Sequence, residues 1–210
     1  MRVLCVLKSG GVYDASWVEK LWSGVYRHMR EPFTFGCLSD VELPDPIERI
    51  PLMHDWPGWW AKLEMFRPGV IQGPTLYLDL DTVVTGPLDA FTNLPYDFAM
   101  LKNFNNDEMV GSGVMWFKEK APAGVYERFV QGPERVMEFY KNAKIGSYVG
   151  DQAFIWDTLD RQVDTISSPA LRSYKEHCRN GLPEGTSLVA FHGRPRPTEI
   201  HPDWLKEHWA

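Results

Sequence analysis

The first part of the chain alternates between apolar runs and amphipathic stretches. The run 3–7 is apolar throughout and opens into a polar loop with two glycines, the pattern of a strand that is buried on both faces. The stretch 16–29 has apolar residues at helical intervals and begins with Ser16 and Glu19 at the spacing of a capping box. The run 33–38 has the pattern of a second strand. The order strand, helix, strand predicts an α/β fold with a largely parallel sheet.

The same alternation continues through the rest of the chain. After a proline-rich connector, helical patterns occur at 59–66, 125–144 and 151–159, strand patterns at 75–80, 98–102, 113–117 and 188–191, and a stiff, proline-studded tail at 194–202. The long helical pattern is interrupted near Gly132 and Pro133. Neither an internal repeat nor a convincing linker is present. We therefore expect residues 1–210 to form one domain, with a mixed, mostly parallel sheet flanked by helices.

Composition and charge exclude several classes of partner. With 44% hydrophobic and 24% charged residues, the 210-residue chain has the make-up of an ordinary globular domain. The net charge is −6, and the 22 Lys and Arg residues are scattered, so no nucleic-acid partner is expected. Apolar runs are too short for a signal peptide or a membrane span. The three cysteines are odd in number and widely spaced, and we expect reduced thiols and a cytoplasmic location.

Candidate chemistry is concentrated at the end of the expected strand 75–80. Asp79 and Asp81 are two residues apart, so on a strand their side chains point to the same side. Open α/β sheets bind ligands at the carboxyl ends of their strands. Two carboxylates so close repel each other unless a cation joins them, and oxygen ligands suit Mg²⁺ or Mn²⁺, which also binds a diphosphate. The alternative is a pair of solvated acidic residues at a loop end.

Several motifs together resemble one enzyme family. The run YLDLDTVV at 77–84, followed by GPL at 86–88, resembles the Asp-x-Asp strand and turn of the family 8 glycosyltransferases of the A-type fold, which include glycogenin and bacterial lipooligosaccharide galactosyltransferases. Four further segments resemble motifs of that family in the same order: WAKLEMF at 60–66, SGVM at 112–115, GDQ at 150–152 and FHG at 191–193. The resemblance spans most of the chain.

The resemblance implies an A-type fold and a nucleotide-sugar donor, with UDP as the favoured nucleotide. It implies that Asp79, Asp81 and His192 hold Mn²⁺ or Mg²⁺, and imidazole with two carboxylates is a reasonable set of ligands for Mn²⁺. It also implies that Lys62 reaches the donor. A structural histidine and a solvated lysine on an amphipathic helix are the alternatives for His192 and Lys62.

The resemblance implies that Asp151 and Gln152 contact the transferred sugar, and we take them as the candidate catalytic residues. The alternative for Asp151 is a helix N-cap. The family's closing segment has a lysine where this chain has arginine, so either Arg194 or Arg196 would meet the diphosphate. Three further candidates are less specific. Tyr13 would stack on the base or pack locally, and Asn103 and Asn105 would bind sugar hydroxyls or form turns.

The most specific prediction is a metal-dependent glycosyltransferase that moves a hexose from a UDP-sugar to an acceptor, which would be a saccharide, a lipid-linked sugar or a protein. The family retains anomeric configuration, and Gln152 is a poor nucleophile, so retention would proceed by front-face attack. Two alternatives come from other classes. One is a haloacid-dehalogenase-like phosphatase, whose first motif resembles 78–83 but lies on the first strand of its domain. The other is a non-catalytic protein that binds nucleotide sugars or glycans.

Overall fold

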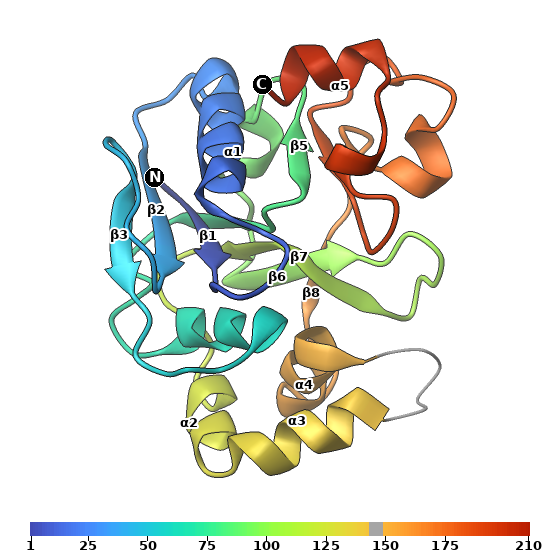
Figure 1. Cartoon of the computed structure of the whole chain (residues 1–210). Helices are drawn as coiled ribbons and strands as arrows, with labels where there is room; N and C mark the ends of the chain where they lie inside the picture. Colours follow the sequence, from blue (N-terminus) through green and yellow to red (C-terminus); the bar gives the residue numbers. More distant parts are fainter. Residues whose placement is uncertain (143–148) are drawn as a thin grey trace.

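A seven-stranded sheet forms the centre of the computed structural model, which describes residues 1–142 and 149–210 (Figure 1). Its strand order is β3-β2-β1-β4-β7-β6-β8. The strands are Arg2–Leu7 (β1), Thr34–Ser39 (β2), Glu48–Pro51 (β3), Thr75–Leu78 (β4), Phe98–Lys102 (β6), Val110–Phe117 (β7) and Asp164–Ile166 (β8). β1 to β4 are parallel to one another, and β6 is parallel to β8. Only β7 opposes its neighbours β4 and β6, so the mixed, mostly parallel sheet is as predicted.

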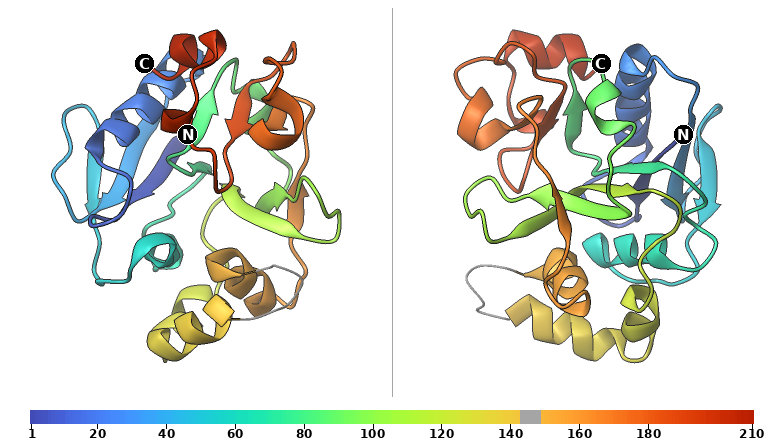
Figure 2. Two further views of the ribbon diagram at one scale, coloured as in Figure 1. Left: turned by 45° about the vertical axis from the view of Figure 1, so that its right-hand side comes forward. Right: turned by 180° about the vertical axis from the view of Figure 1, so that it is seen from behind.

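Helices cover both faces of this sheet (Figures 1 and 2). On one face lies α1 (Ala15–His28), and on the other lie η1 (Gly58–Phe66), α2 (Val125–Val130), α3 (Pro133–Asn142) and α4 (Gly150–Thr158). Successive side chains of β1 alternate between the two resulting cores. Val3 and Cys5 join the cluster that contains α1, and Leu4 joins the cluster that contains η1. A strand covered on both sides needs the unbroken apolar run seen at 3–7.

A second, three-stranded sheet packs beside α1. It consists of Thr82–Val84 (β5), Leu188–Ala190 (β10) and Leu171–Ser173 (β9), in the order β5-β10-β9. β10 runs antiparallel to β5, with Ala190 opposite Thr82. This pairing brings the segment that follows β10 next to the acidic segment that precedes β5. The small sheet therefore joins two distant parts of the chain at one end of the large sheet.

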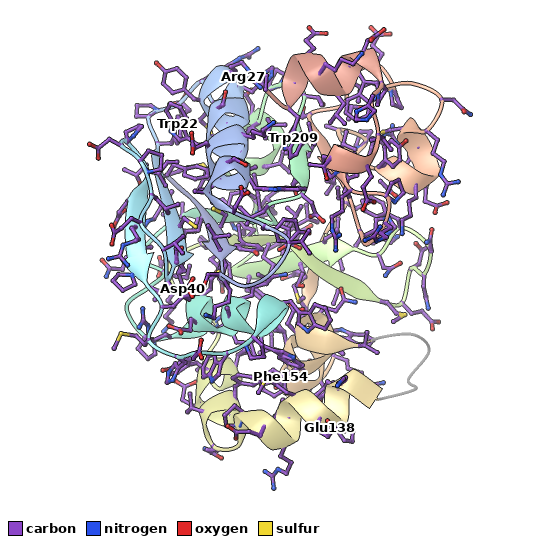
Figure 3. The ribbon with its side chains drawn as sticks, in the orientation of Figure 1. Trp22, Arg27, Asp40, Glu138, Phe154 and Trp209 are labelled. Atoms are coloured by element: carbon purple, nitrogen blue, oxygen red, sulfur yellow. The ribbon has the colours of Figure 1, made fainter. Side chains whose placement is uncertain are left out.

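The C-terminal helix α5 (Asp203–His208) closes the molecule on the side of α1. Trp209, which follows α5, lies beside α1 (Figure 3), and its ring contacts Trp17 edge to face at 4.8 Å. Lys20 Nζ lies 4.2 Å from the centre of the Trp209 ring. Aromatic and cation–π contacts of this kind stabilise the docking of a short terminal helix that would be marginal alone.

The start of α1 differs from the prediction. Its N-cap is Asp14 and not Ser16, because the Asp14 carboxylate accepts a hydrogen bond from the Ser16 backbone N–H at 2.9 Å. Aspartate and serine cap helices about equally well, so spacing alone did not choose between them. With Asp14 as N-cap, the position that a capping box requires is Trp17, and Glu19 lies beyond it.

The other predicted helices and strands are present at the predicted places in the chain, but several differ in length or type from the prediction. The expected strand 75–80 ends at Leu78, and the helical pattern 59–66 winds as a 3₁₀ helix. The pattern 125–144 divides into α2 and α3, and residues 143 and 144 lie outside the described residues. Strands β3, β5, β8 and β9 and helix α5 were not predicted. Each has only three to six residues, too few to show a clear period.

The three cysteines are free and buried, as expected for reduced thiols. In the described part of the chain, none of the helices combines the length and the apolar character needed to traverse a lipid bilayer.

Candidate functional site

A pocket of about 620 Å³ opens at the carboxyl ends of β1 and β4. Its walls come from the loop after β1, from η1, from the turn after β4, from the loop between β6 and β7 with the start of β7, from the start of α4 and from the segment after β10. Ten of the eleven residues named as site candidates from the sequence line it: Tyr13, Lys62, Asp79, Asp81, Asn103, Asn105, Asp151, Gln152, His192 and Arg196. The fold thus gathers residues from six separate segments around one cavity.

The turn after β4 brings the two aspartates to the pocket. Thr82 N–H donates to the Asp79 carbonyl oxygen at 3.0 Å, which closes a tight turn immediately after Leu78. Leu80, between the aspartates, is buried in the core under α1. The sequence predicts that Asp79 and Asp81 lie on one strand, whose alternation would point both side chains to the same side. This prediction is wrong, because β4 ends at Leu78. A turn brings the two aspartates together instead, with Leu80 as its apolar anchor.

Lys62 is the centre of the buried charge network. Its ammonium group lies 2.9 Å from Asp79 Oδ1, 3.1 Å from Asp151 Oδ2 and 3.0 Å from Ser112 Oγ. Ser112 Oγ in turn donates to Asp151 Oδ2 at 2.6 Å. Burial alone would lower the pKa of Lys62, but the carboxylates of Asp151 and Asp79 raise it above its ordinary value. The Ser112 carbonyl oxygen is a fourth partner at 3.4 Å, so the three N–H donors of the ammonium group are saturated within the protein.

Asp81 has a different environment from Asp79. Its carboxylate accepts a hydrogen bond from the Tyr13 hydroxyl at 2.9 Å, whereas Asp79 accepts one from the Tyr77 hydroxyl at 2.5 Å. Burial and the negative charge of Asp79 raise the pKa of Asp81 to about 7. Tyr13 also packs edge to face on Trp17, with ring centres 4.7 Å apart. Packing, one of the two expectations for Tyr13, is therefore what the structure has, and stacking on a base stays a prediction.

This pair of carboxylates fits a hard divalent cation. The repulsion that raises the pKa of Asp81 is the interaction that a bound cation would relieve, and the oxygen donors are of the type that Mg²⁺ and Mn²⁺ prefer. In the described parts of the chain, no three His, Cys, Asp or Glu side chains gather closely enough to hold a metal. A ligand set made only of protein side chains is thus not assembled there, and the identity of a third ligand stays a prediction.

His192 lines the same pocket, but its Nε2 lies 2.6 Å from Ser173 Oγ. Its ring stacks on Phe104 with centres 5.7 Å apart. Burial and the nearby charge of Lys175 lower the pKa of His192, which favours the neutral imidazole that binds metals. Ser173 holds the ring through one nitrogen, as hydrogen-bond partners commonly do for histidines that bind metals.

The structure distinguishes the two arginines that the sequence left open. Arg196 lines the pocket, its side chain is 21% exposed, and its guanidinium lies 5.9 Å from the centre of the Tyr13 ring. Arg194 is 75% exposed and forms an ion pair with Glu199 at 2.9 Å. Arg196 is the arginine positioned to face a ligand in the pocket.

The start of α4 brings Asp151 and Gln152 to the pocket. Val149 is the N-cap of α4, so the alternative in which Asp151 caps the helix is wrong. The Asp151 carboxylate is instead committed to Lys62 and Ser112. Asn103 both lines the pocket and forms a turn, since its side-chain oxygen accepts hydrogen bonds from the N–H groups of residues 105 and 106. Asn105 also lines the pocket.

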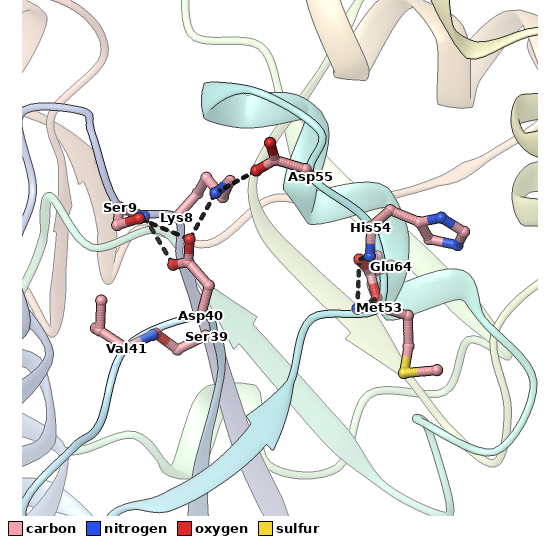
Figure 4. Close-up of polar contacts among 9 residues, drawn as sticks. All are labelled: Lys8, Ser9, Ser39, Asp40, Val41, Met53, His54, Asp55 and Glu64. Atoms are coloured by element: carbon pink, nitrogen blue, oxygen red, sulfur yellow. Dashed lines mark hydrogen bonds and ion pairs between the residues drawn. The ribbon is translucent and has the colours of Figure 1, made fainter.

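Sequence reasoning missed several residues of the pocket wall. Lys8 follows β1 and forms ion pairs with Asp40 at 2.5 Å and Asp55 at 2.8 Å (Figure 4). The sequence indicates Ser112 only as part of the motif at 112–115, and Trp59 only as the start of the helical pattern 59–66. The available signal for Lys8 was its positive charge beside the loop with two glycines. Its partners Asp40 and Asp55 come from other parts of the chain, so the sequence does not indicate the ion pairs.

The fold is that of the A-type glycosyltransferases. The chain is similar to the glycosyltransferase GlyE of Streptococcus pneumoniae TIGR4, with a TM-score of 0.69 and 14% identity over 93% of this chain and 56% of GlyE. It is also similar to the galactosyltransferase LgtC in complex with donor and acceptor sugar analogues, with a TM-score of 0.58 and 13% identity over 97% of this chain and 90% of LgtC. A third similar structure is the bifunctional glycosyltransferase WbbM, with a TM-score of 0.62 and 12% identity over 94% of this chain and 46% of WbbM.

The chain thus spans about half the length of GlyE and WbbM. The sequence matches no protein-family model and no curated protein. The motif at 78–83 begins at the last residue of β4, the fourth strand along the chain. This position does not suit the dehalogenase-like alternative, because that motif belongs to the first strand of its domain.

Proposed function

We propose that this chain is a glycosyltransferase that moves a hexose from a nucleotide-sugar donor to an acceptor with the help of Mn²⁺ or Mg²⁺. UDP is the nucleotide favoured by resemblance, and the acceptor is a saccharide, a lipid-linked sugar or a protein. The observation that carries the proposal is the convergence of Lys62, Asp79, Asp81 and Asp151 in one pocket on this fold. The fold alone would not be enough, because one fold hosts many functions.

The residues of the pocket divide the work by position. A divalent cation held by Asp79 and Asp81, with His192 as the expected third ligand, would neutralise the diphosphate of the donor. Arg196 faces the same cavity and would bind phosphate oxygens through its planar guanidinium. The ammonium group of Lys62 lies 2.9 Å and 3.1 Å from the Asp79 and Asp151 carboxylates, and we assign it the role of positioning them. The donor contact expected from the sequence stays a prediction and would require the ammonium group to exchange one of its protein partners.

Asp151 and Gln152 would orient the transferred sugar. Transfer breaks the bond between the anomeric carbon and the diphosphate oxygen, which leaves with the electron pair, and forms a bond to the acceptor oxygen. In front-face attack the acceptor's proton passes to the departing diphosphate, so no carboxylate nucleophile is required. Positive charge beside the diphosphate would stabilise the leaving group as its charge develops.

The test is the release of UDP from UDP-galactose, UDP-glucose and UDP-N-acetylglucosamine, with Mn²⁺ or with EDTA. We expect Mn²⁺-dependent release that falls roughly 100-fold or more in Asp81→Asn, since one lost electrostatic contact at a reacting centre typically costs this much. Asp97→Asn is the matched control, because the Asp97 side chain is 97% exposed and does not line the pocket. Binding of UDP without turnover would support a non-catalytic binding protein. Release of phosphate from p-nitrophenyl phosphate would support a phosphatase.

A further inference from the structure

Two adjacent tryptophans of η1 have opposite environments. Trp60 is 5% exposed and stacks on Phe129, with ring centres 5.5 Å apart and planes within 13° of parallel. Trp59 is 56% exposed and lines the pocket. Because Trp60 is held in the core, its neighbour on the helix must point away from that core. A large apolar ring that remains half exposed inside a pocket is an unusual use of tryptophan, and it indicates a ligand surface.

The Trp59 ring is held in place by the backbone of Gly150. A Cβ atom added to Gly150 would lie 3.0 Å from Nε1, 3.4 Å from Cε2 and 3.5 Å from Cδ1 of Trp59. The five-membered ring therefore packs directly against the Gly150 backbone, which adopts a φ of 79° that favours glycine. The indole is preordered, so a ligand that contacts it does not bear the full cost of fixing the side chain.

The position of this ring relative to the charge network defines what it can contact. Gly150 directly precedes Asp151, whose carboxylate is in the buried network with Lys62. Val12 and Val149 also line the pocket and are exposed. The groups expected to hold the diphosphate are largely buried, whereas the Trp59 surface is open to solvent. The ring thus lies on the open side of the pocket, beside the residues proposed to orient the transferred sugar.

We propose that Trp59 is the stacking surface for a sugar ring of the acceptor, so that the acceptor is a saccharide. A pyranose ring has C–H groups on its faces and hydroxyl groups on its edge, and its apolar face packs well on an aromatic ring while its hydroxyls stay hydrated. A charged peptide segment would instead find no formal charge on the Trp59, Val12 and Val149 surfaces. The inference rests on the proposed function and specifies its acceptor.

Binding tests the proposal without turnover. The probes are methyl hexopyranosides, lactose and maltose, added to the full chain while the indole N–H signals are followed by NMR. Trp59→Phe identifies the Trp59 signal by its loss. We expect at least one saccharide to shift that signal in a saturable way, and Trp59→Ala to weaken binding of that saccharide about tenfold. Saccharide binding that leaves the Trp59 signal unmoved, or no binding of any probe, would overturn the proposal.

Kinetics separate this proposal from the proposed function. With a saccharide that binds, we expect Trp59→Ala to raise the acceptor KM about tenfold and to change the donor KM much less. Trp59→Phe, which keeps an aromatic ring, should have an acceptor KM close to that of the wild type. Tyr26→Ala is the matched control, because Tyr26 is an exposed aromatic residue on α1 outside the pocket wall. A larger effect on the donor KM than on the acceptor KM would contradict the proposal. Failure of the wild type to release UDP would contradict the proposed function, while the NMR result would still decide the role of Trp59.

Discussion

Lys62 shows how a single buried charge organises the pocket. Its ammonium group lies between the carboxylates of Asp79 and Asp151, which are 72 residues apart in the sequence. Removing water from three charged groups costs several kcal/mol for each ion, and close pairing and hydrogen bonds offset that cost. Removing one partner therefore leaves the others in an unfavourable environment. The network is thus a requirement of the fold in this region as well as a feature of the pocket.

We predict that Lys62→Met destabilises the protein by about 3 kcal/mol, because it leaves the Asp151 carboxylate buried without its cation. Urea unfolding at pH 7 measures the change. Adding Asp151→Asn to Lys62→Met should recover part of the loss, since the amide removes the uncompensated charge. Lys118→Met, which removes an exposed ion pair with Asp97, is the matched control and should change stability by less than about 0.5 kcal/mol. Equal stability of Lys62→Met and the wild type would contradict this account.

At the scale of elements, a carboxylate cluster anchors the loops around the first strands. Asp40, after β2, accepts hydrogen bonds from the backbone N–H and the hydroxyl of Ser9 at 2.8 Å and 2.6 Å and pairs with Lys8 (Figure 4). Glu64, which is buried in η1, accepts hydrogen bonds from the N–H groups of residues 53 and 54 in the loop that precedes η1 (Figure 4). These side chains satisfy backbone donors that no strand pairs, and so hold the loops that border the pocket.

The pKa of Asp40 gives this anchor a definite pH dependence. Burial raises that pKa, but hydrogen bonds from Lys8 and Ser9 outweigh burial and lower it to about 2 from an ordinary value of 3.8. A lowered carboxyl pKa contributes stability that is complete above about pH 4 and is lost as the pH falls through 2. We predict that Asp40→Asn lowers the free energy of unfolding by about 1 kcal/mol at pH 7, less than the pKa shift alone implies, because the side chain is 26% exposed and solvent screens its ion pair. The difference in unfolding free energy between the variant and the wild type should narrow between pH 4 and pH 2.

Urea unfolding of both proteins at a series of pH values checks this prediction. Asp55→Asn is the control, because Asp55 also pairs with Lys8 but its side chain is 96% exposed, so it should cost less than about 0.5 kcal/mol. A difference between Asp40→Asn and the wild type that stays constant from pH 7 down to pH 2 would be evidence against the anchor.

At the scale of the whole molecule, the small sheet determines which distant segments meet at the pocket. β5 follows the two aspartates and β10 precedes His192, and their antiparallel pairing brings both to the same cavity. The end of β5 is closed against β10 by hydrogen bonds from Thr85, whose N–H donates to the Ser187 carbonyl oxygen at 2.8 Å. The next residue is Gly86, where the segments that follow β5 and precede β10 approach each other closely.

We predict that Gly86→Ala destabilises the protein by about 2 kcal/mol, since its Cβ would lie 2.8 Å from the Thr186 carbonyl oxygen and backbone must move to admit it. Gly11→Ala is the matched control, because its Cβ would meet its nearest neighbour, the Lys8 carbonyl oxygen, at 3.7 Å. Thermal unfolding compares the two. A Gly86→Ala melting temperature no lower than that of Gly11→Ala would show that the contact between β5 and β10 tolerates expansion.

The sequence by itself determined the elements whose pattern is long and local. Core strands such as 3–7, the helix after it and the acidic pair Asp79 and Asp81 are legible because burial imposes a period on neighbouring residues. The α/β class followed from the order of these elements. The motif resemblance pointed to the A-type fold, which the structure confirms.

Only the tertiary structure decided which side chains meet. The pairing of Lys62 with Asp151 and the position of Arg196, but not Arg194, at the pocket wall depend on contacts between segments far apart in the chain. The same holds for Trp59 and Trp60, whose neighbouring positions in sequence give no hint of opposite exposure. A local pattern indicates that an element has a buried face, whereas the exposure of each residue in a short element and the identity of its partners are set by long-range packing, which leaves no periodic trace in the sequence.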